Sequence, residues 1–200
     1  MTVASVAAQG CFDMIRLPLL AVSLLPTTAM AHVEVCPASL YSGLVHPLDG
    51  LDHVLAIVAV GLWAVQTGSR ALWSLPLTFA GSLLAACLLV MCGVAVPPVE
   101  PIIFASIIVL GAAAGLALQM PQPVALALVA VFGAAHGATH AIDAPHQSPG
   151  LFLLGLGATT LALTGAGVFG GRALMARRAG GAFKALGALT AGAGLVLASI

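Results

Sequence analysis

Six apolar segments follow one another along the chain after residue 45, with short polar breaks between them. Each is near the length of about 20 residues that a helix needs to cross a bilayer. The segments cover approximately residues 46–66, 74–96, 102–119, 124–143, 150–170 and 182–200. Their breaks are rich in Gly, Pro or polar residues, which are typical of tight helix connections. The pattern predicts an all-α polytopic membrane protein, a compact bundle of six transmembrane helices formed by residues 32–200.

The first 31 residues have the features of a secretory signal peptide. Arg16 precedes an apolar run that is too short to cross a bilayer, and the segment ends in the cleavage pattern Ala29-Met30-Ala31. We therefore predict a signal peptide over residues 1–31, cleaved after Ala31, and a mature chain that begins at His32 outside the cytoplasm. The alternative is a short uncleaved anchor, and two methionines can serve as the start.

Charged side chains are scarce, and their placement predicts the orientation. They make up 6% of the sequence, against about a quarter in a soluble domain. The net charge is zero, no basic run suits nucleic acid, and no G-x4-G-K-[ST] phosphate loop indicates an ATPase. The cations after the signal lie in or beside odd-numbered breaks: Arg70, Arg172, Arg177, Arg178 and Lys184. The positive-inside rule then predicts that the odd-numbered connections are cytoplasmic and both termini lie outside. We expect the chain in a bacterial inner membrane, with these termini in the periplasm.

A cluster of ionisable residues opens the first apolar segment, as His46-Pro47-Leu48-Asp49-Gly50-Leu51-Asp52-His53. The apolar remainder of that segment is too short to cross alone, so we expect the cluster inside the outer part of the membrane. On one continuous helix His46, Asp49 and His53 would share a face, and Asp52 would point elsewhere. Intramembrane ionisable groups usually mark an ion or substrate path. The alternatives to an ion path are purely structural roles: helix capping by Asp49, an interfacial position of His46 and a structural Asp52–His53 pair.

A second cluster ends the fourth segment, where His136, His140 and Asp143 are spaced i, i+4 and i+7 on one expected helix face. Because the fourth segment runs outward, this cluster should meet the first one at a similar depth. Two imidazoles at this spacing can bind one metal ion. Imidazole and carboxylate ligands suit Ni(II), Co(II), Zn(II) or Cu(II) better than Mg(II) or Ca(II). The free amine and imidazole of His32 could bind the same ion.

The motif His46-Pro47-x-x-Gly50-x-Asp52-His53 resembles the signature of the HupE/UreJ family of nickel/cobalt permeases. The run His136-Gly137-Ala138-Thr139-His140 is similar to that family's second motif, with Thr139 in place of its alanine. The resemblance implies a cleaved signal, a mature chain that starts at or near a histidine, and six spans. It also implies an ion path through the matching residues: His46, Asp52, His53, His136 and His140.

From these observations we predict that the protein is a permease and not an enzyme. It would import Ni(II) or Co(II), and the membrane potential would drive this transport. We expect no cofactor besides the transported ion. The expected partners are the lipid bilayer and a nickel-enzyme maturation system, and the oligomeric state stays open. The expected metal-binding residues are His32, His46, Asp49, Asp52, His53, His136, His140 and Asp143. The alternatives are an intramembrane zinc-dependent hydrolase that uses the same cluster and a membrane assembly subunit with a structural Asp–His network.

Overall fold

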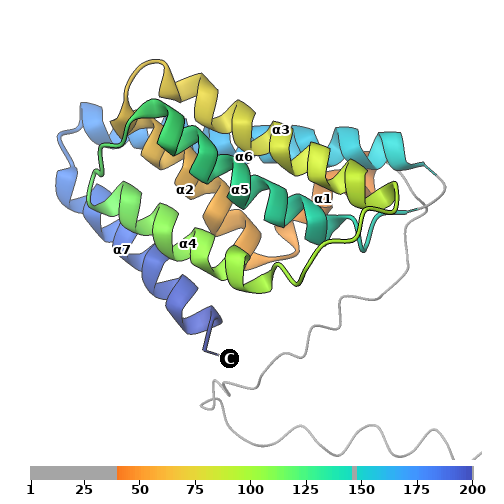
Figure 1. Ribbon diagram of the computed structural model, residues 1–200. Coiled ribbons are helices and arrows are strands. Elements are labelled where there is room, and N and C mark those ends of the chain that lie inside the picture. The colour runs from red at the N-terminus through yellow and green to blue at the C-terminus, as the bar shows by residue number, and fades with distance from the viewer. Residues whose placement is uncertain (1–39, 146–147, 200) are drawn as a thin grey trace, which may run out of the picture. The chain divides into compact units, whose positions relative to one another are not determined.

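The computed structural model describes residues 40–145 and 148–199, and within them every regular element is a helix (Figure 1). The elements are α1 (Leu40–Val45), the 3-10 helix η1 (His46–Leu48), α2 (Leu51–Thr67), α3 (Ala71–Met91), α4 (Glu100–Gly115), α5 (Gln122–His140), α6 (Pro149–Ala176) and α7 (Gly180–Leu197). Each of the six predicted apolar segments overlaps one of the helices α2 to α7. The predicted signal peptide, its cleavage after Ala31 and His32 lie outside the described residues.

The helix ends follow local chain chemistry. Gly68 ends α2 in a left-handed conformation with a φ of 129°, which glycine adopts at little cost. Proline lies in the first turn of α4, α5 and α6, where its missing N–H group has no partner to lose. These signals explain why the predicted and observed ends agree within a few residues for most of the helices.

Helix length supports a membrane protein and leaves the number of spans open. Among the helices of the described residues, four (α3, α5, α6 and α7) are long and apolar enough to cross a bilayer. The segment Leu40–Leu48 and α2 together would make a fifth span, although they are bent by 85° relative to each other. At 16 residues, or about 24 Å, α4 is shorter than these four helices. The all-helical membrane architecture is confirmed, and the count of six spans stays a prediction.

The first segment departs from the sequence prediction. We expected one continuous helix from His46, whereas the structure has a 3-10 turn there, an extended Gly50 and a new helix from Leu51. The preceding helix α1 was not predicted at all. It packs on α6, where the backbone at Gly43 touches the Phe152 carbonyl and the Thr159 hydroxyl donates to the Leu44 carbonyl at 2.7 Å.

The bundle has two chemically different ends. Helices α2, α4 and α6 run from one end to the other, and α3, α5 and α7 run back, so that Gln122 of α5 lies beside Ser74 of α3. We call the first the histidine end, because His46 and His140 lie there, and the other the arginine end. The described acidic residues belong to the histidine end: Asp49, Asp52, Glu100 and Asp143. The described cations belong to the arginine end: Arg70, Arg172, Arg177, Arg178 and Lys184.

Helix α2 lies in the middle of the bundle, in contact with α3, α4 and α6 (Figure 1). The indole N–H of its buried Trp63 donates to the Leu118 carbonyl at 2.9 Å, which ties α2 to the connection after α4. Helices α3 and α5 pack closely because Gly137 brings the α5 backbone onto the Leu83 carbonyl of α3. This contact fixes the part of α5 that carries the two histidines.

Candidate metal-binding site

Four imidazole rings from the two predicted clusters form a continuous row. The ring centroids of His46 and His140 are 4.8 Å apart, and those of His140 and His53 are 4.5 Å apart. His53 is followed by His136, with 4.9 Å between the centroids. The first segment and α5 therefore contribute alternate rings. The expected meeting of the two clusters at one depth is what the structure shows, although the first segment is not one helix.

The row runs from the surface at the histidine end into the core. The side chain of His46 is 20% exposed and that of His53 is 12% exposed. His140 and His136 are almost fully enclosed, at 2% and 0% of their residue surface. The ring nitrogens of an enclosed imidazole need a hydrogen-bond partner or another ligand, because buried polar atoms are rarely left unpaired. An ion that starts at His46 would thus leave water as it moves along the row.

The orientation of His136 is fixed by its own helix. Its Nδ1 lies 2.8 Å from the Phe132 carbonyl oxygen, which can only accept, so Nδ1–H donates and Nε2 keeps its lone pair. The ring of Phe79 packs beside it, with 5.4 Å between the centroids. A hydrogen bond from one ring nitrogen to a carbonyl is the usual support for a histidine whose other nitrogen binds metal.

Three ring nitrogens of the row are buried without a hydrogen-bond partner among the described residues: His53 Nδ1, His136 Nε2 and His140 Nε2. An unpaired buried polar atom costs about 1–3 kcal/mol. A cation bound between neighbouring rings would use these lone pairs and remove that cost. This set of unpaired nitrogens is the strongest structural sign that the row binds a ligand.

Asp52 places a carboxylate oxygen beside the row. Its Oδ1 lies 2.9 Å from His53 Nδ1, in contact but not aligned for a hydrogen bond with the ring. A carboxylate oxygen and an imidazole nitrogen this close could hold one cation together. Gly50 leaves the room for this pair, because a Cβ there would lie 2.5 Å from Asp52 Oδ1 and 2.9 Å from His53 Nδ1.

We expect the substitution Gly50→Ala to lower metal uptake without harming the fold. Gly50 has an ordinary extended backbone, with φ −111° and ψ 120°, that alanine adopts freely, so only the two side-chain tips must move. Displaced metal ligands reduce affinity or activity by about tenfold or more. Uptake of labelled nickel per membrane-inserted protein measures the effect. Gly81→Ala, where a Cβ meets nothing within 4 Å, is the control, and equal uptake by both variants contradicts the role of Gly50.

Two carboxylates flank the exposed end of the row. Asp49 Oδ2 lies 4.0 Å from His46 Nδ1, and Asp143 Oδ2 lies 3.9 Å from His46 Nε2. Both side chains are well exposed, at 68% and 43%, so they can attract cations from water. Asp143 does not share a helix face with the α5 histidines as predicted, because α5 ends at His140 and Asp143 lies in the following turn.

The row is not a closed metal centre. Within residues 40–145 and 148–199, no three His, Cys, Asp or Glu side chains converge to hold one ion.

The sequence analysis did not predict the aromatic neighbours of the row, Phe79 at His136 and Phe152 at His46. The carbonyl of Phe132, one helical turn before His136, could have been identified from helix periodicity, whereas the rings of Phe79 and Phe152 come from other helices.

Comparison with known proteins adds independent information. A family model described as HupE / UreJ protein matches residues 20–197. Protein HupE of Rhizobium leguminosarum bv. viciae is 35% identical over 182 residues, which cover 84% of this chain and 93% of that protein. No solved structure matches. The chain therefore belongs to the HupE/UreJ family, a family of membrane transporters and not of enzymes.

Proposed function

We propose that this protein is a permease that carries Ni(II) or Co(II) across a bacterial inner membrane along the histidine row. The observation that carries the proposal is the unbroken contact of four imidazoles, two of which, His136 and His140, have a buried Nε2 with no hydrogen-bond or ion-pair partner among the described residues. A structural Asp–His network would be expected to pair those nitrogens internally. Family membership sets the zinc-hydrolase alternative aside.

The donor chemistry supports a borderline transition metal as the transported ion. Imidazole nitrogens with carboxylate oxygens favour Ni(II) and Co(II) over Mg(II) or Ca(II). The described cysteines do not join the row: Cys87 contacts Met91, with 3.9 Å between the sulfur atoms, and Cys92 is exposed. Soft Cu(I), which prefers thiolate and thioether ligands, is therefore a poor substrate for these residues.

In the proposed path an ion is captured near His46, between Asp49 and Asp143, and moves to His140. It then passes to His53 with Asp52, and finally to His136. Each transfer exchanges one ligand for its neighbour at 4.5–4.9 Å between ring centroids. A path must bind its ion firmly enough to admit it and weakly enough to release it. The absence of three converging ligands in the described part of the chain favours release.

The proposed topology follows the distribution of charge. The arginine end faces the cytoplasm and the histidine end faces the periplasm, as the positive-inside rule requires. All six segments cross in this arrangement, α4 included, and both termini lie outside. His32, as the first residue after cleavage, would supply an additional amine and imidazole for capture. Delivery of nickel to an enzyme maturation system is the expected use of the imported ion.

Uptake of labelled nickel by cells that express this chain tests the proposal. A divalent cation gains about 4.6 kcal/mol from 100 mV, at about 2.3 kcal/mol per charge, which corresponds to more than about a thousandfold accumulation. We therefore expect uptake to fall to background when an ionophore removes the membrane potential. Unlabelled cobalt should compete for uptake and magnesium should not. Potential-independent uptake, or equal competition by magnesium, contradicts the proposal.

A further inference from the structure

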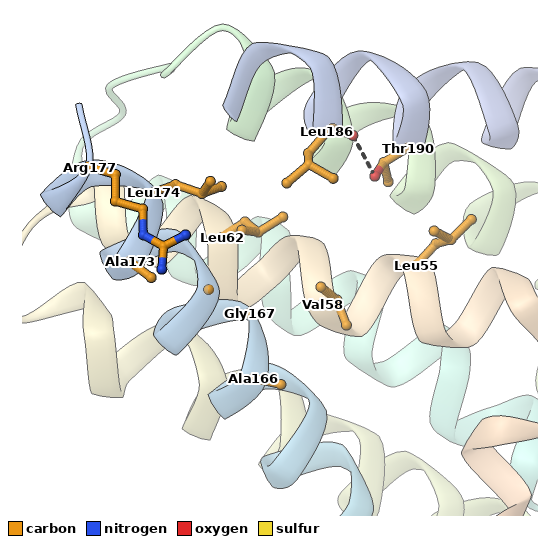
Figure 2. A pocket seen from close by; sticks show the side chains of 11 residues that line it. Leu55, Val58, Leu62, Ala166, Gly167, Ala173, Leu174, Arg177, Leu186 and Thr190 are labelled. Atoms are coloured by element: carbon orange, nitrogen blue, oxygen red, sulfur yellow. Dashed lines mark hydrogen bonds between the residues drawn. The ribbon is translucent and has the colours of Figure 1, made fainter. Parts of the chain in front are cut away.

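An apolar groove between α2, α6 and α7 lies apart from the histidine row. It encloses a cavity of about 470 Å³, within the range of about 300–1,000 Å³ typical of sites for small organic ligands. Its walls are aliphatic side chains, with Leu55 and Leu62 from α2 and Leu186 from α7 (Figure 2). Arg177, at one end in the same view, is the single charged residue that lines it.

The groove exists because the helices around it pack elsewhere. Helix α7 packs mainly on α4, and α6 packs mainly on α2, so α6 and α7 touch little. The α6 wall consists largely of small residues, such as Ala166, Gly170 and Ala173. At Gly170 a Cβ would meet no atom within 4 Å, so the backbone borders open space.

The charge at the end of the groove lacks a counter-ion. No acidic side chain in the described part of the chain forms an ion pair with Arg177, and the described carboxylates all belong to the histidine end. Arg172, five residues earlier on α6, lines a different cavity that includes Val65 and Leu72. An exposed guanidinium next to an apolar groove is complementary to a ligand with an anionic head and an apolar tail.

The dimensions fit one leaflet of a membrane. The distance along α6 from Ala166 to the C-cap residue Arg177 is eleven residues, or about 16 Å at 1.5 Å per residue. Half of a hydrocarbon core of about 30 Å is about 15 Å. An acyl chain that lies in the groove would therefore end near the mid-plane of the bilayer while its head group stays beside Arg177.

We propose that this groove binds one acyl chain of an anionic phospholipid, whose phosphate is held by Arg177. The site needs only the membrane location of the bundle and is independent of metal transport. Its lipid belongs to the leaflet at the arginine end. Bound there, the lipid would fill the space between α6 and α7 and hold these two helices together.

Native mass spectrometry of the full-length protein in detergent, titrated with phosphatidylglycerol, tests the charged part of the site. We expect Arg177→Gln to weaken binding about fivefold, which corresponds to about 1 kcal/mol for one basic residue at an anionic surface. Arg172→Gln, with the same loss of charge at the same end of α6, should bind within about twofold of the unaltered protein. An equal loss in both variants shows nonspecific attraction and overturns the proposal.

Filling the groove tests the apolar part. We expect Gly170→Leu to weaken both phosphatidylglycerol and phosphatidylcholine binding, because the new side chain occupies the space for the acyl chain. Gly165→Leu, at another α6 position with no atom within 4 Å of a Cβ, should bind both lipids normally. Similar melting temperatures of the two variants confirm that the fold is intact. Unchanged lipid binding by Gly170→Leu overturns the proposal. The proposal is also overturned if the unaltered protein is a dimer and Gly170→Leu dissociates it, because a second copy would then cover the groove.

Discussion

Replacement of His140 or His53 by alanine is expected to abolish Ni(II) and Co(II) uptake while the protein still reaches the membrane in normal amount. His140 is the ring that contacts both His46 and His53, and His53 joins His140 to His136. Each substitution therefore interrupts the row in its middle. We expect a loss of at least about tenfold, the effect typical of disturbed metal ligation. Labelled nickel uptake, divided by the amount of inserted protein, measures it.

Thr160→Ala is the matched control for the loss of a buried polar group. The Thr160 hydroxyl is fully buried and donates to the Leu156 carbonyl of its own helix at 2.8 Å, away from the imidazoles. Its removal should leave uptake close to that of the unaltered protein. Normal uptake by the His140 and His53 variants would show that the ion takes another route. Equal loss in all three would show that uptake reports the packing of the bundle and not ligation.

The second large effect is expected for Gly137→Ala. Its Cβ would overlap the Leu83 carbonyl of α3, a backbone atom that cannot rotate away. Helix α5 must then move from α3, and His136 and His140 move with it. Small residues at such interfaces are what allow membrane helices to pack closely. We expect the free energy of unfolding to drop by about 1–3 kcal/mol, the usual cost of overpacking, together with a loss of uptake.

The control for this variant is Gly165→Ala on α6, where a Cβ meets no atom within 4 Å. Alanine is the better helix former by up to about 1 kcal/mol, so this protein should melt at the same temperature or higher. Thermal unfolding in detergent compares the two variants under one condition. If the Gly137→Ala and Gly165→Ala proteins have the same melting temperature and Gly137→Ala transports nickel normally, the close contact of α3 and α5 does not position the histidines.

Much of the fold could be predicted from the sequence because the bilayer imposes helix lengths. Uninterrupted apolar runs and residues such as Gly68 and Pro121 located the helices α2 to α7. The break within the first segment could not be predicted from a rotation of 100° per residue, since that reasoning assumes a continuous helix. Pro47 and Gly50 are the signals that indicate the break, and the bend they allow is set by the packing of α1 on α6.

The candidate site was predictable in its parts and not in its arrangement. The scarcity of charged residues and the expected depth of both clusters in the membrane were enough to predict that the two histidine clusters meet. The order of the rings and the pairing of Asp143 with His46 depend on contacts between distant segments, which no local pattern records. The same holds for Phe152, which comes from α6 to pack against His46.

X-ray absorption at the nickel edge of the purified, nickel-loaded protein tests the central claim most directly, because it identifies the side chains bound to the ion. We expect imidazole ligands around nickel in the unaltered protein and fewer of them in the doubly substituted protein with His53→Ala and His140→Ala. Nickel that is surrounded by oxygen ligands alone, or an imidazole signal that persists unchanged in the double variant, would contradict a path along these histidines.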